Sequence, residues 1–365
     1  MRVVICGGGV IGACTAYFLT RRGVEVTVVE GTGVACAASG RAGAFLARDW
    51  NAGTPLDALA RRGFALHSRL PAEVDADWGF HGVTTYGGYV PAGPAPPRRG
   101  RIHLTWVGED VVVTRRLGTP EDTAIVHPAR FTEAMLAAAL RRGAELRPGR
   151  VTGVPRAGSG ARVSGVEVDG GLVPADAVVV AMGPWSALAA AWLPMPQVFP
   201  DRGHSLVFDT GTAVHPEALF LEYQEDTGAV LTPEVFPRAD GTTYVTAFAE
   251  PATLPADPAD VTPDPVAIER LESVCARLSP ALDPDRILVR QACHRPVTQD
   301  GLPLIGRVPG VDGAYVATGH SVWGILGAPA TGEALAELIT DGAARSTDLT
   351  PFDPARLRPL DPVKS

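Results

Sequence analysis

Apolar β-type runs, glycine turns and helical repeats follow one another within the first thirty residues. Residues 2–6 form a short apolar run, and the glycine-rich turn 7–12 follows it directly. Apolar side chains then recur at helical spacing up to residue 22, and residues 24–29 form a second β-branched run that ends at Glu30. The pattern predicts strand, turn, helix and strand, which is the order of a βαβ unit.

The same periodicities predict further elements along the chain. Helical spacing covers residues 56–70, 128–142, 268–278 and 330–341. Residues 162–173 predict a hairpin around Asp169 and two glycines, and residues 177–181 predict a buried strand. Residues 78–114 and 203–250 have β-type and turn composition. The predicted fold class is α/β, with a Rossmann-like domain and a β-rich, antiparallel-sheet substrate domain inserted discontinuously.

The length of 365 residues predicts two domains, because a single compact core rarely grows so large. We expect residues 1–80, 126–198 and 290–345 to form the nucleotide-binding domain. The substrate domain would comprise residues 81–125 and 199–289, and residues 346–365 would form a C-terminal tail. A basic, proline-rich tip is expected at residues 94–101.

Composition narrows the range of partners. The net charge of −8 argues against nucleic acid and anionic membranes. Five scattered cysteines without a CxxC pair indicate neither a zinc site nor a disulfide framework, and no other metal site is expected. The longest uncharged run, residues 177–200, is interrupted by prolines, and a strand begins at residue 2, so we expect a cytoplasmic protein without a signal peptide. The only lysine is Lys364, which leaves none for catalysis.

The glycine turn has the spacing of a dinucleotide-binding site. Gly7 allows the tight turn, Gly9 allows close approach of backbone to a pyrophosphate, and Gly12 allows the helix to pack on the strand. The exposed N–H groups and the dipole of the helix N-terminus favour an anion there. Glu30, at the end of the second strand, can accept hydrogen bonds from ribose hydroxyls.

Four segments resemble the flavoprotein family of D-amino-acid oxidase, glycine oxidase and sarcosine oxidase, in particular its glycine oxidase branch. They are residues 7–30, 38–43, 181–186 and 293–332. The resemblance implies FAD rather than NAD, and oxidation of the C–N bond of an amino acid or amine to an imine by hydride transfer to flavin N5. An aromatic-ring hydroxylase is disfavoured, because the chain lacks a GD dipeptide before its last helix.

The family pattern also implies which residues contact FAD. These are Gly7, Gly9, Val10, Ile11, Gly12, Glu30, Ser39, Gly40, Arg41, Ala42, Gly43, Val151, Ala181, Gly183, Trp185, Cys293, Gly319, His320, Gly324, Ile325 and Leu326. The N-terminus of a helix beginning at Ala330 is expected to stabilise negative charge on the reduced flavin by roughly 0.3–1 kcal/mol.

Arg295 and His320 are the predicted catalytic residues. Arg295 matches the family's arginine that pairs with the substrate carboxylate, which a planar guanidinium grips with two parallel hydrogen bonds. His320 would position the isoalloxazine or tune its reactivity with oxygen, with a purely structural histidine as the alternative. Strand alternation turns His294 away from the pocket, and His204 is expected to be structural.

Other side chains leave alternatives open. Cys293 either carries the flavin through a thioether, as in sarcosine oxidases, or is a buried thiol beside non-covalent FAD. Trp323, Tyr223 and Phe248 are candidates for the apolar wall of the substrate cavity. Glu222 could meet the amine, although a solvated carboxylate is the favoured interpretation.

The expected partners are a small amine or amino acid and, as electron acceptor, oxygen. Sarcosine oxidases use a lysine near the flavin to activate oxygen, and this chain has none there. Arg295 or His320 would replace it, or the enzyme would be a dehydrogenase. Two other functions stay open: oxidation of a larger biosynthetic intermediate, for which a wide cavity near residues 78–101 would speak, and a flavin-binding protein with a sorting or scaffolding role. Substrate side chain, stereochemistry and oligomeric state are not determined.

Overall fold

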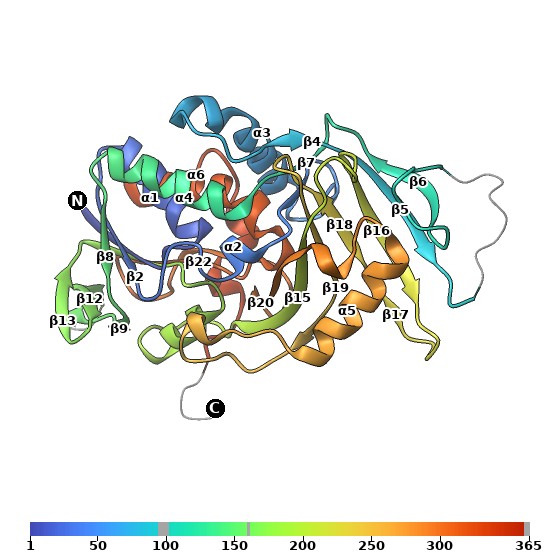
Figure 1. Ribbon diagram of the computed structural model, residues 1–365. Coiled ribbons are helices and arrows are strands. Elements are labelled where there is room, and N and C mark those ends of the chain that lie inside the picture. The colour runs from blue at the N-terminus through green and yellow to red at the C-terminus, as the bar shows by residue number, and fades with distance from the viewer. Residues whose placement is uncertain (94–101, 159–160, 361–365) are drawn as a thin grey trace.

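The computed structural model describes residues 1–93, 102–158 and 161–360. The basic tip expected at residues 94–101 and Lys364 lie outside these ranges. Two regions stand side by side, a mostly parallel sheet with helices and a larger, mostly antiparallel sheet (Figure 1). The predicted mixture of a Rossmann-like region and an antiparallel-sheet region is confirmed.

Five parallel strands form most of the first sheet, whose order is β21-β22-β14-β1-β2-β8. The strands are β1 (Arg2–Cys6), β2 (Glu25–Glu30), β8 (Glu145–Pro148), β14 (Ala177–Val180), β22 (Ala314–Thr318) and the antiparallel edge strand β21 (Leu304–Arg307). Apart from the exposed edge strand β8, their apolar residues are buried on both faces, as is usual for a parallel sheet. β1 and β14 pair directly, so residues about 175 positions apart in sequence lie side by side in the middle of the sheet.

Four helices pack together on one face of this sheet in a common hydrophobic core. They are α1 (Val10–Arg21), α3 (Asp57–Val74), α4 (Pro128–Arg141) and α6 (Gly324–Asp341). The predicted start of the last helix at Ala330 is wrong, because α6 begins six residues earlier and contains Pro329. A proline leaves the carbonyl four residues before it without its helical donor. His67 Nε2 lies 2.8 Å from that carbonyl oxygen, on Ile325, and supplies the missing hydrogen bond.

The opposite face of the parallel sheet is covered by small β elements and a 3₁₀ segment. The elements are β9 (Val151–Gly153), β12 (Gly165–Val168), β13 (Gly171–Pro174) and η1 (Gly183–Ala191), and β12 and β13 form the predicted hairpin. Minor elements in the remaining loops are α2 (Ala38–Arg41), β10 (Arg156–Ala157), β11 (Arg162–Val163), η2 (Pro258–Asp260), η3 (Pro284–Arg286), η4 (Ser321–Trp323), η5 (Thr350–Phe352) and η6 (Pro354–Arg356).

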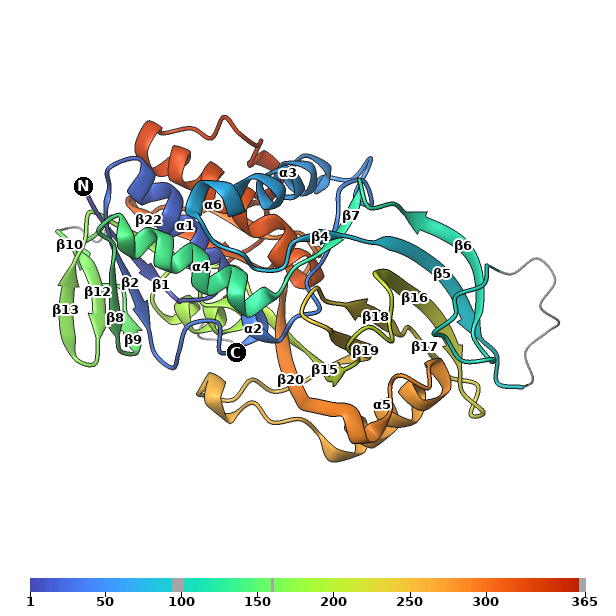
Figure 2. The same ribbon diagram turned by 45° about the horizontal axis from the view of Figure 1, so that its top comes forward.

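The second region is an eight-stranded sheet in the order β20-β15-β19-β18-β16-β5-β6, with β17 paired to β16. Its strands are β5 (Thr84–Val90), β6 (Val112–Gly118), β15 (Phe199–Asp209), β16 (Glu217–Gln224), β17 (Val230–Leu231), β18 (Glu234–Pro237), β19 (Thr242–Pro251) and β20 (Ile287–Val297). Helix α5 (Pro265–Leu278) packs on one face, and the other face turns toward the first region (Figure 2).

A three-stranded sheet and the long strand β20 connect the two regions. The small sheet has the order β3-β7-β4, with β3 (Phe45–Ala47), β7 (Thr123–Ile125) and β4 (His81–Gly82). β20 pairs with β15 along its whole length and so crosses the boundary expected at residue 290. The domain division otherwise stays a prediction. No helix in the described ranges is long and apolar enough to cross a bilayer.

Candidate active site

A cavity of about 460 Å³ lies where the carboxyl ends of the parallel strands face the large sheet. Gly7 follows β1, Ala181 follows β14 and His320 follows β22, and all three line the cavity. Ligands of open α/β sheets bind at this edge, because the loops there diverge and leave a crevice. We call the part lined by Gly7, Gly9, Val10, Ile11 and Glu30 the glycine end.

The glycine turn is tight enough to require glycine at two positions. Gly7 has a φ of +111°, which side chains rarely adopt, and a Cβ there would lie 2.5 Å from the Ala181 carbonyl oxygen. A Cβ on Gly12 would lie 2.0 Å from the Gly7 carbonyl oxygen, so helix α1 packs directly on the turn. Gly12 itself does not line the cavity. Its predicted role in helix packing thus has a structural basis.

The helix N-terminus opens into the cavity. Gly9, Val10 and Ile11 all line it, and Gly9 has no side chain to cap the helix. The Val10 N–H donates to Ser39 Oγ at 2.9 Å, which brings the segment around Ser39 against the turn. Backbone N–H groups at such a terminus favour an anionic ligand.

Glu30 lines the cavity and organises the loop that follows it. Its carboxylate accepts hydrogen bonds from the N–H groups of Gly8 at 2.7 Å, Thr32 at 2.8 Å and Gly33 at 3.1 Å. A carboxylate has about four lone-pair sites and can accept further bonds. This geometry allows Glu30 to accept hydrogen bonds from ribose hydroxyls, and that role stays a prediction.

Only some residues of the segment 38–43 line the cavity, and the others pack against neighbouring parts of the chain. Ser39, Ala42 and Gly43 line the cavity, whereas Gly40 and Arg41 do not. The Arg41 guanidinium donates to the carbonyl oxygens of Val261 and Ala292 instead. Gly40 is small for packing, because a Cβ there would lie 2.1 Å from a backbone oxygen of Ala35.

The loop that precedes α5 crosses the glycine end of the cavity, and the sequence did not predict this arrangement. Asp257 in this loop accepts from Thr32 Oγ1 at 2.9 Å and from Arg150 Nη2 at 2.7 Å. The Pro255 carbonyl accepts from the indole of Trp185 at 2.8 Å. Trp185 and the predicted Val151 both line the cavity. The loop's Pro/Asp composition gave no signal of these long-range contacts.

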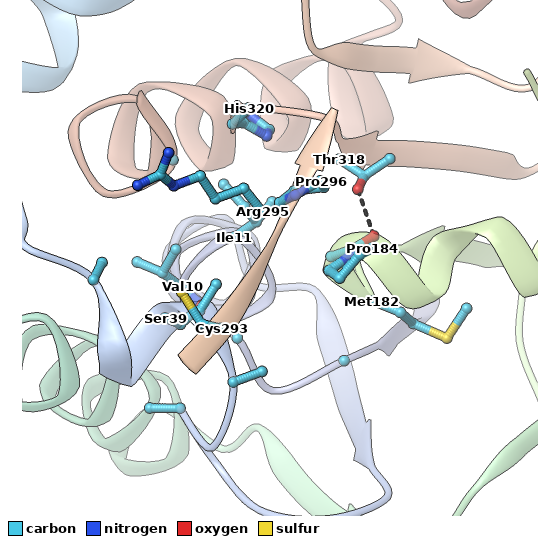
Figure 3. Close-up of a pocket in the computed structure, with 18 of the residues that line it drawn as sticks. Val10, Ile11, Ser39, Met182, Pro184, Cys293, Arg295, Pro296, Thr318 and His320 are labelled. Carbon is cyan, nitrogen blue, oxygen red and sulfur yellow. Dashed lines mark hydrogen bonds between the residues drawn. The ribbon is translucent and has the colours of Figure 1, made fainter. Parts of the chain in front are cut away.

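The C-terminal motif contributes His320, Gly324 and Ile325 to the cavity, whereas Gly319 and Leu326 lie behind it. Gly319 has a φ of +80°, so glycine is required for the turn. Thr318 Oγ1 donates to the Gly183 carbonyl at 2.8 Å and ties the loops after β22 and β14 together (Figure 3).

His320 is a buried, neutral imidazole. Its Nε2 lies 3.0 Å from Thr331 Oγ1, and its Nδ1 is buried without a partner in the described part of the chain. Burial lowers the pKa of His320 to about 3, because desolvation disfavours the charged form. His320 therefore contributes no positive charge near neutral pH.

Arg295 and Cys293 project from β20 into the cavity (Figure 3). His294 points the other way, as alternation predicts, and packs edge-on against Trp185 outside the cavity lining. Burial raises the pKa of the Cys293 thiol, which keeps it protonated. On the same far face, His204 Nε2 accepts from the Asp264 N–H at 3.0 Å, consistent with a structural role.

The apolar wall is built mostly from aromatic residues that sequence reasoning did not select. Trp323 lines the cavity as predicted, but Tyr223 and Phe248 pack in the core beside α5, on the opposite face of the sheet. The actual wall, which we call the aromatic end, comprises Phe45, Trp50, Phe220, Phe236 and Tyr244. Ring centroids in this group lie 4.8–6.0 Å apart.

The carboxylate at the aromatic end is Glu234, not Glu222. Glu222 is exposed on β16, whereas Glu234 opens β18 and lines the cavity. Glu234 pairs across the sheet with Phe220, and Glu222, two residues beyond Phe220 on β16, shares that face but does not line the cavity. Desolvation raises the pKa of Glu234, and the Arg295 guanidinium opposes this shift more weakly.

Comparison with known proteins identifies the family. A model described as FAD dependent oxidoreductase matches residues 2–338. The chain belongs to this family of FAD-dependent oxidoreductases, which confirms the resemblance, and its cofactor is FAD.

Relatives and solved structures agree with this assignment. The chain is 28% identical to an oxidoreductase of Schizosaccharomyces pombe, C1F5.03c, over 96% of this chain and 97% of that protein. It is 29% identical to glycine oxidase of Pseudomonas aeruginosa, over 97% and 98% respectively. The structure of glycine oxidase from Geobacillus kaustophilus superposes with a TM-score of 0.80 at 24% identity, covering 97% of this chain and 99% of that one.

The cavity residues fit FAD. The glycine turn leaves a cradle that any Cβ on Gly7 would close, and the α1 N-terminus suits a pyrophosphate. The small residues Ala181, Gly183 and Gly324 leave room for a flat ring between the loops after β14 and β22.

Proposed function

We propose that the protein oxidises the C–N bond of an α-amino acid or a related carboxylated amine to an imine, which water then hydrolyses. The observation that carries this proposal is Arg295, a guanidinium that faces the cavity with no carboxylate bound to it among the described residues. Bound FAD supplies the acceptor for the hydride, and oxygen is the proposed final electron acceptor.

The chain's own residues would bind and orient the substrate. Arg295 would grip the carboxylate through two parallel hydrogen bonds. The aromatic end would exclude water, which strengthens every charge interaction within the cavity. Because His320 is neutral, Arg295 is the cationic side chain available near the ring to favour reduction of oxygen.

The larger-substrate alternative has less support. It called for a wide cavity near residues 78–101, and no described residue between 51 and 148 lines the cavity. A sorting or scaffolding role finds no specific observation in its favour. The cavity itself, with charged and aromatic side chains beyond the FAD cradle, favours a small substrate.

The visible spectrum of the purified protein is the first test. A flavin spectrum before acid precipitation reports bound FAD. After precipitation, flavin that stays in the protein pellet indicates a covalent link to Cys293, and flavin in the supernatant indicates non-covalent FAD. A panel of amines with a dye acceptor then tests turnover, and anaerobic reduction followed by rapid mixing with oxygen separates oxidase from dehydrogenase.

Arg295→Met tests the carboxylate site. A charge-assisted hydrogen bond contributes about 1.5–3 kcal/mol, so we expect KM for carboxylated amines to rise roughly 10- to 150-fold with flavin content unchanged. Arg290→Met is the matched control, since Arg290 lies on the same strand but binds Glu272 at the surface. An unchanged KM in Arg295→Met would refute the assignment.

A further inference from the structure

Two side chains of opposite charge face the cavity without partners. Arg295 comes from β20 and Glu234 from β18, and neither makes a hydrogen bond or ion pair with any described residue. Elsewhere on the same sheet, Arg202 of β15 binds Glu250 of β19 at 2.6 Å. An unpaired cation and anion at one cavity indicate a ligand that carries both complementary charges.

The sheet register brings these two side chains to the same face. Glu234 pairs with Thr246, Thr246 with Ser205, and Ser205 with Gln291, so one row of residues crosses four strands. Arg295 lies four residues beyond Gln291 on β20, and residues an even number apart on a strand share a face. The two charges thus approach the cavity from one rigid surface.

Close packing holds the guanidinium in place. A Cβ on Gly203 would lie 3.3 Å from Arg295 Nη2, so the guanidinium lies directly over this glycine. At the aromatic end, the backbone at Gly43 packs closely against the Phe236 ring, because a Cβ on Gly43 would lie 2.6 Å from that ring. Aromatic walls offer few hydrogen bonds, and Glu234 and Arg295 are charged side chains of the cavity that a polar ligand could bond.

We propose that Glu234 binds the substrate's amino group opposite Arg295 and accepts its proton, so that the site selects amino acids over simple carboxylates. This inference rests on the proposed function and deepens it. The carboxylate of the ligand would bind Arg295, its ammonium would bind Glu234, and its side chain would lie against the aromatic end.

The proton transfer balances within the site. An N–H bond of the ammonium breaks, an O–H bond forms on the Glu234 carboxylate, and the nitrogen keeps the electron pair as a neutral amine. Only the neutral amine has the lone pair that drives loss of hydride from the adjacent carbon. A carboxyl whose pKa is raised by desolvation is a stronger base for this step than an exposed one.

Other titratable groups face Glu234 and must be considered in any pH profile. Those that line the same cavity are Arg295 and Cys293 on β20, Tyr244 on β19 and His320 before α6. Burial raises the pKa of Tyr244 to about 12 and also raises that of Cys293, while that of His320 falls to about 3. The raised pKa of Glu234 and the pKa of the substrate amine are therefore the two that the pH profile is expected to report.

The test compares two ligands that differ only in the amino group, phenylalanine of either configuration and 3-phenylpropanoate, on the FAD-loaded protein. Binding of 3-phenylpropanoate is followed by perturbation of the visible flavin spectrum, and phenylalanine by the concentration dependence of anaerobic flavin reduction. In Glu234→Gln we expect phenylalanine to bind about 10- to 100-fold more weakly, from loss of a charge-assisted bond. We expect 3-phenylpropanoate to bind severalfold more tightly, because an unpaired negative charge has been removed.

Glu222→Gln is the matched control, since it changes the same residue type on the adjoining strand at the exposed surface. It should leave both ligands unchanged. The limiting rate of flavin reduction in Glu234→Gln should also lose its acidic pH dependence and follow only the amine. If both ligands weaken together, or neither changes, Glu234 does not bind the amine. If wild-type protein oxidises no amine but binds FAD, the proposed function itself fails.

Discussion

At the glycine end of the cavity the chain presents backbone, whereas at the aromatic end it presents side chains. Gly7, Gly9 and the α1 N-terminus form the first, all within one βαβ unit. The second combines Phe45 from β3 with strands β16, β18, β19 and β20 of the large sheet. Backbone contacts suit an invariant ligand such as FAD, while side chains from separate strands can change independently to suit a substrate.

The largest effect on stability and flavin content is expected from a substitution at Gly12, where the backbone leaves no space for a side chain. In Gly12→Ala the new methyl group would meet a carbonyl oxygen at 2.0 Å and force α1 off the turn. We expect a loss of about 3 kcal/mol in the free energy of unfolding and of most bound flavin. Urea unfolding and the visible-to-ultraviolet absorbance ratio measure these quantities.

Gly171→Ala is the control for this change. A Cβ there meets its nearest atom, the Val168 carbonyl oxygen, at an ordinary 3.6 Å. If Gly12→Ala kept full flavin and a normal unfolding midpoint, the claim that packing fixes the glycine end would be wrong.

Acid should weaken the protein through the buried imidazole of His320, which lines the cavity. The pKa of His320 is about 3 in the folded protein and about 6.5 unfolded, so the unfolded chain binds the proton first as pH falls. The stabilisation is complete above pH 6.5 and is lost progressively below it, by about 2 kcal/mol at pH 5. His67, whose pKa burial lowers to about 4, adds to the same trend.

Urea unfolding at pH 7.5 and pH 5, at fixed FAD concentration, measures this loss. His320→Asn, which can still bond Thr331, should lose less stability between the two pH values than wild type. His215→Asn, a change at an exposed histidine, should behave as wild type. Equal losses in all three proteins would show that His320 is not the responsible group.

The smallest expected effect, that of Gly203→Ala on KM, distinguishes the aromatic end from the glycine end, because it should change substrate binding without changing flavin binding. In Gly203→Ala the methyl group would lie 3.3 Å from Arg295 Nη2, so the guanidinium would shift by a few tenths of an ångström. We expect KM for carboxylated amines to rise about fivefold, or roughly 1 kcal/mol. Flavin content and turnover of amines without a carboxylate should not change, and a loss of flavin would contradict the separation of the ends.

Local sequence was sufficient for the glycine end and for most helices. The turn, α1 and the strand ending at Glu30 are all encoded within thirty residues, so period and glycine spacing predict them. The sequence placed the start of α6 at Ala330, whereas the helix begins at Gly324 and contains Pro329. The carbonyl it leaves free is bonded by His67, about 260 positions away in sequence, which no local pattern reveals.

The sequence by itself determined the family, the cofactor and the strand that carries Arg295, because each depends on motifs contiguous along the chain. Only the tertiary structure decided which aromatic residues and which glutamate face the cavity. Tyr223 and Phe248 fall on the α5 side, and Glu234 lines the cavity, whereas Glu222 shares its face but lies exposed outside the cavity lining. A strand's alternation fixes which residues share a face, but which face meets the ligand depends on what packs against the other.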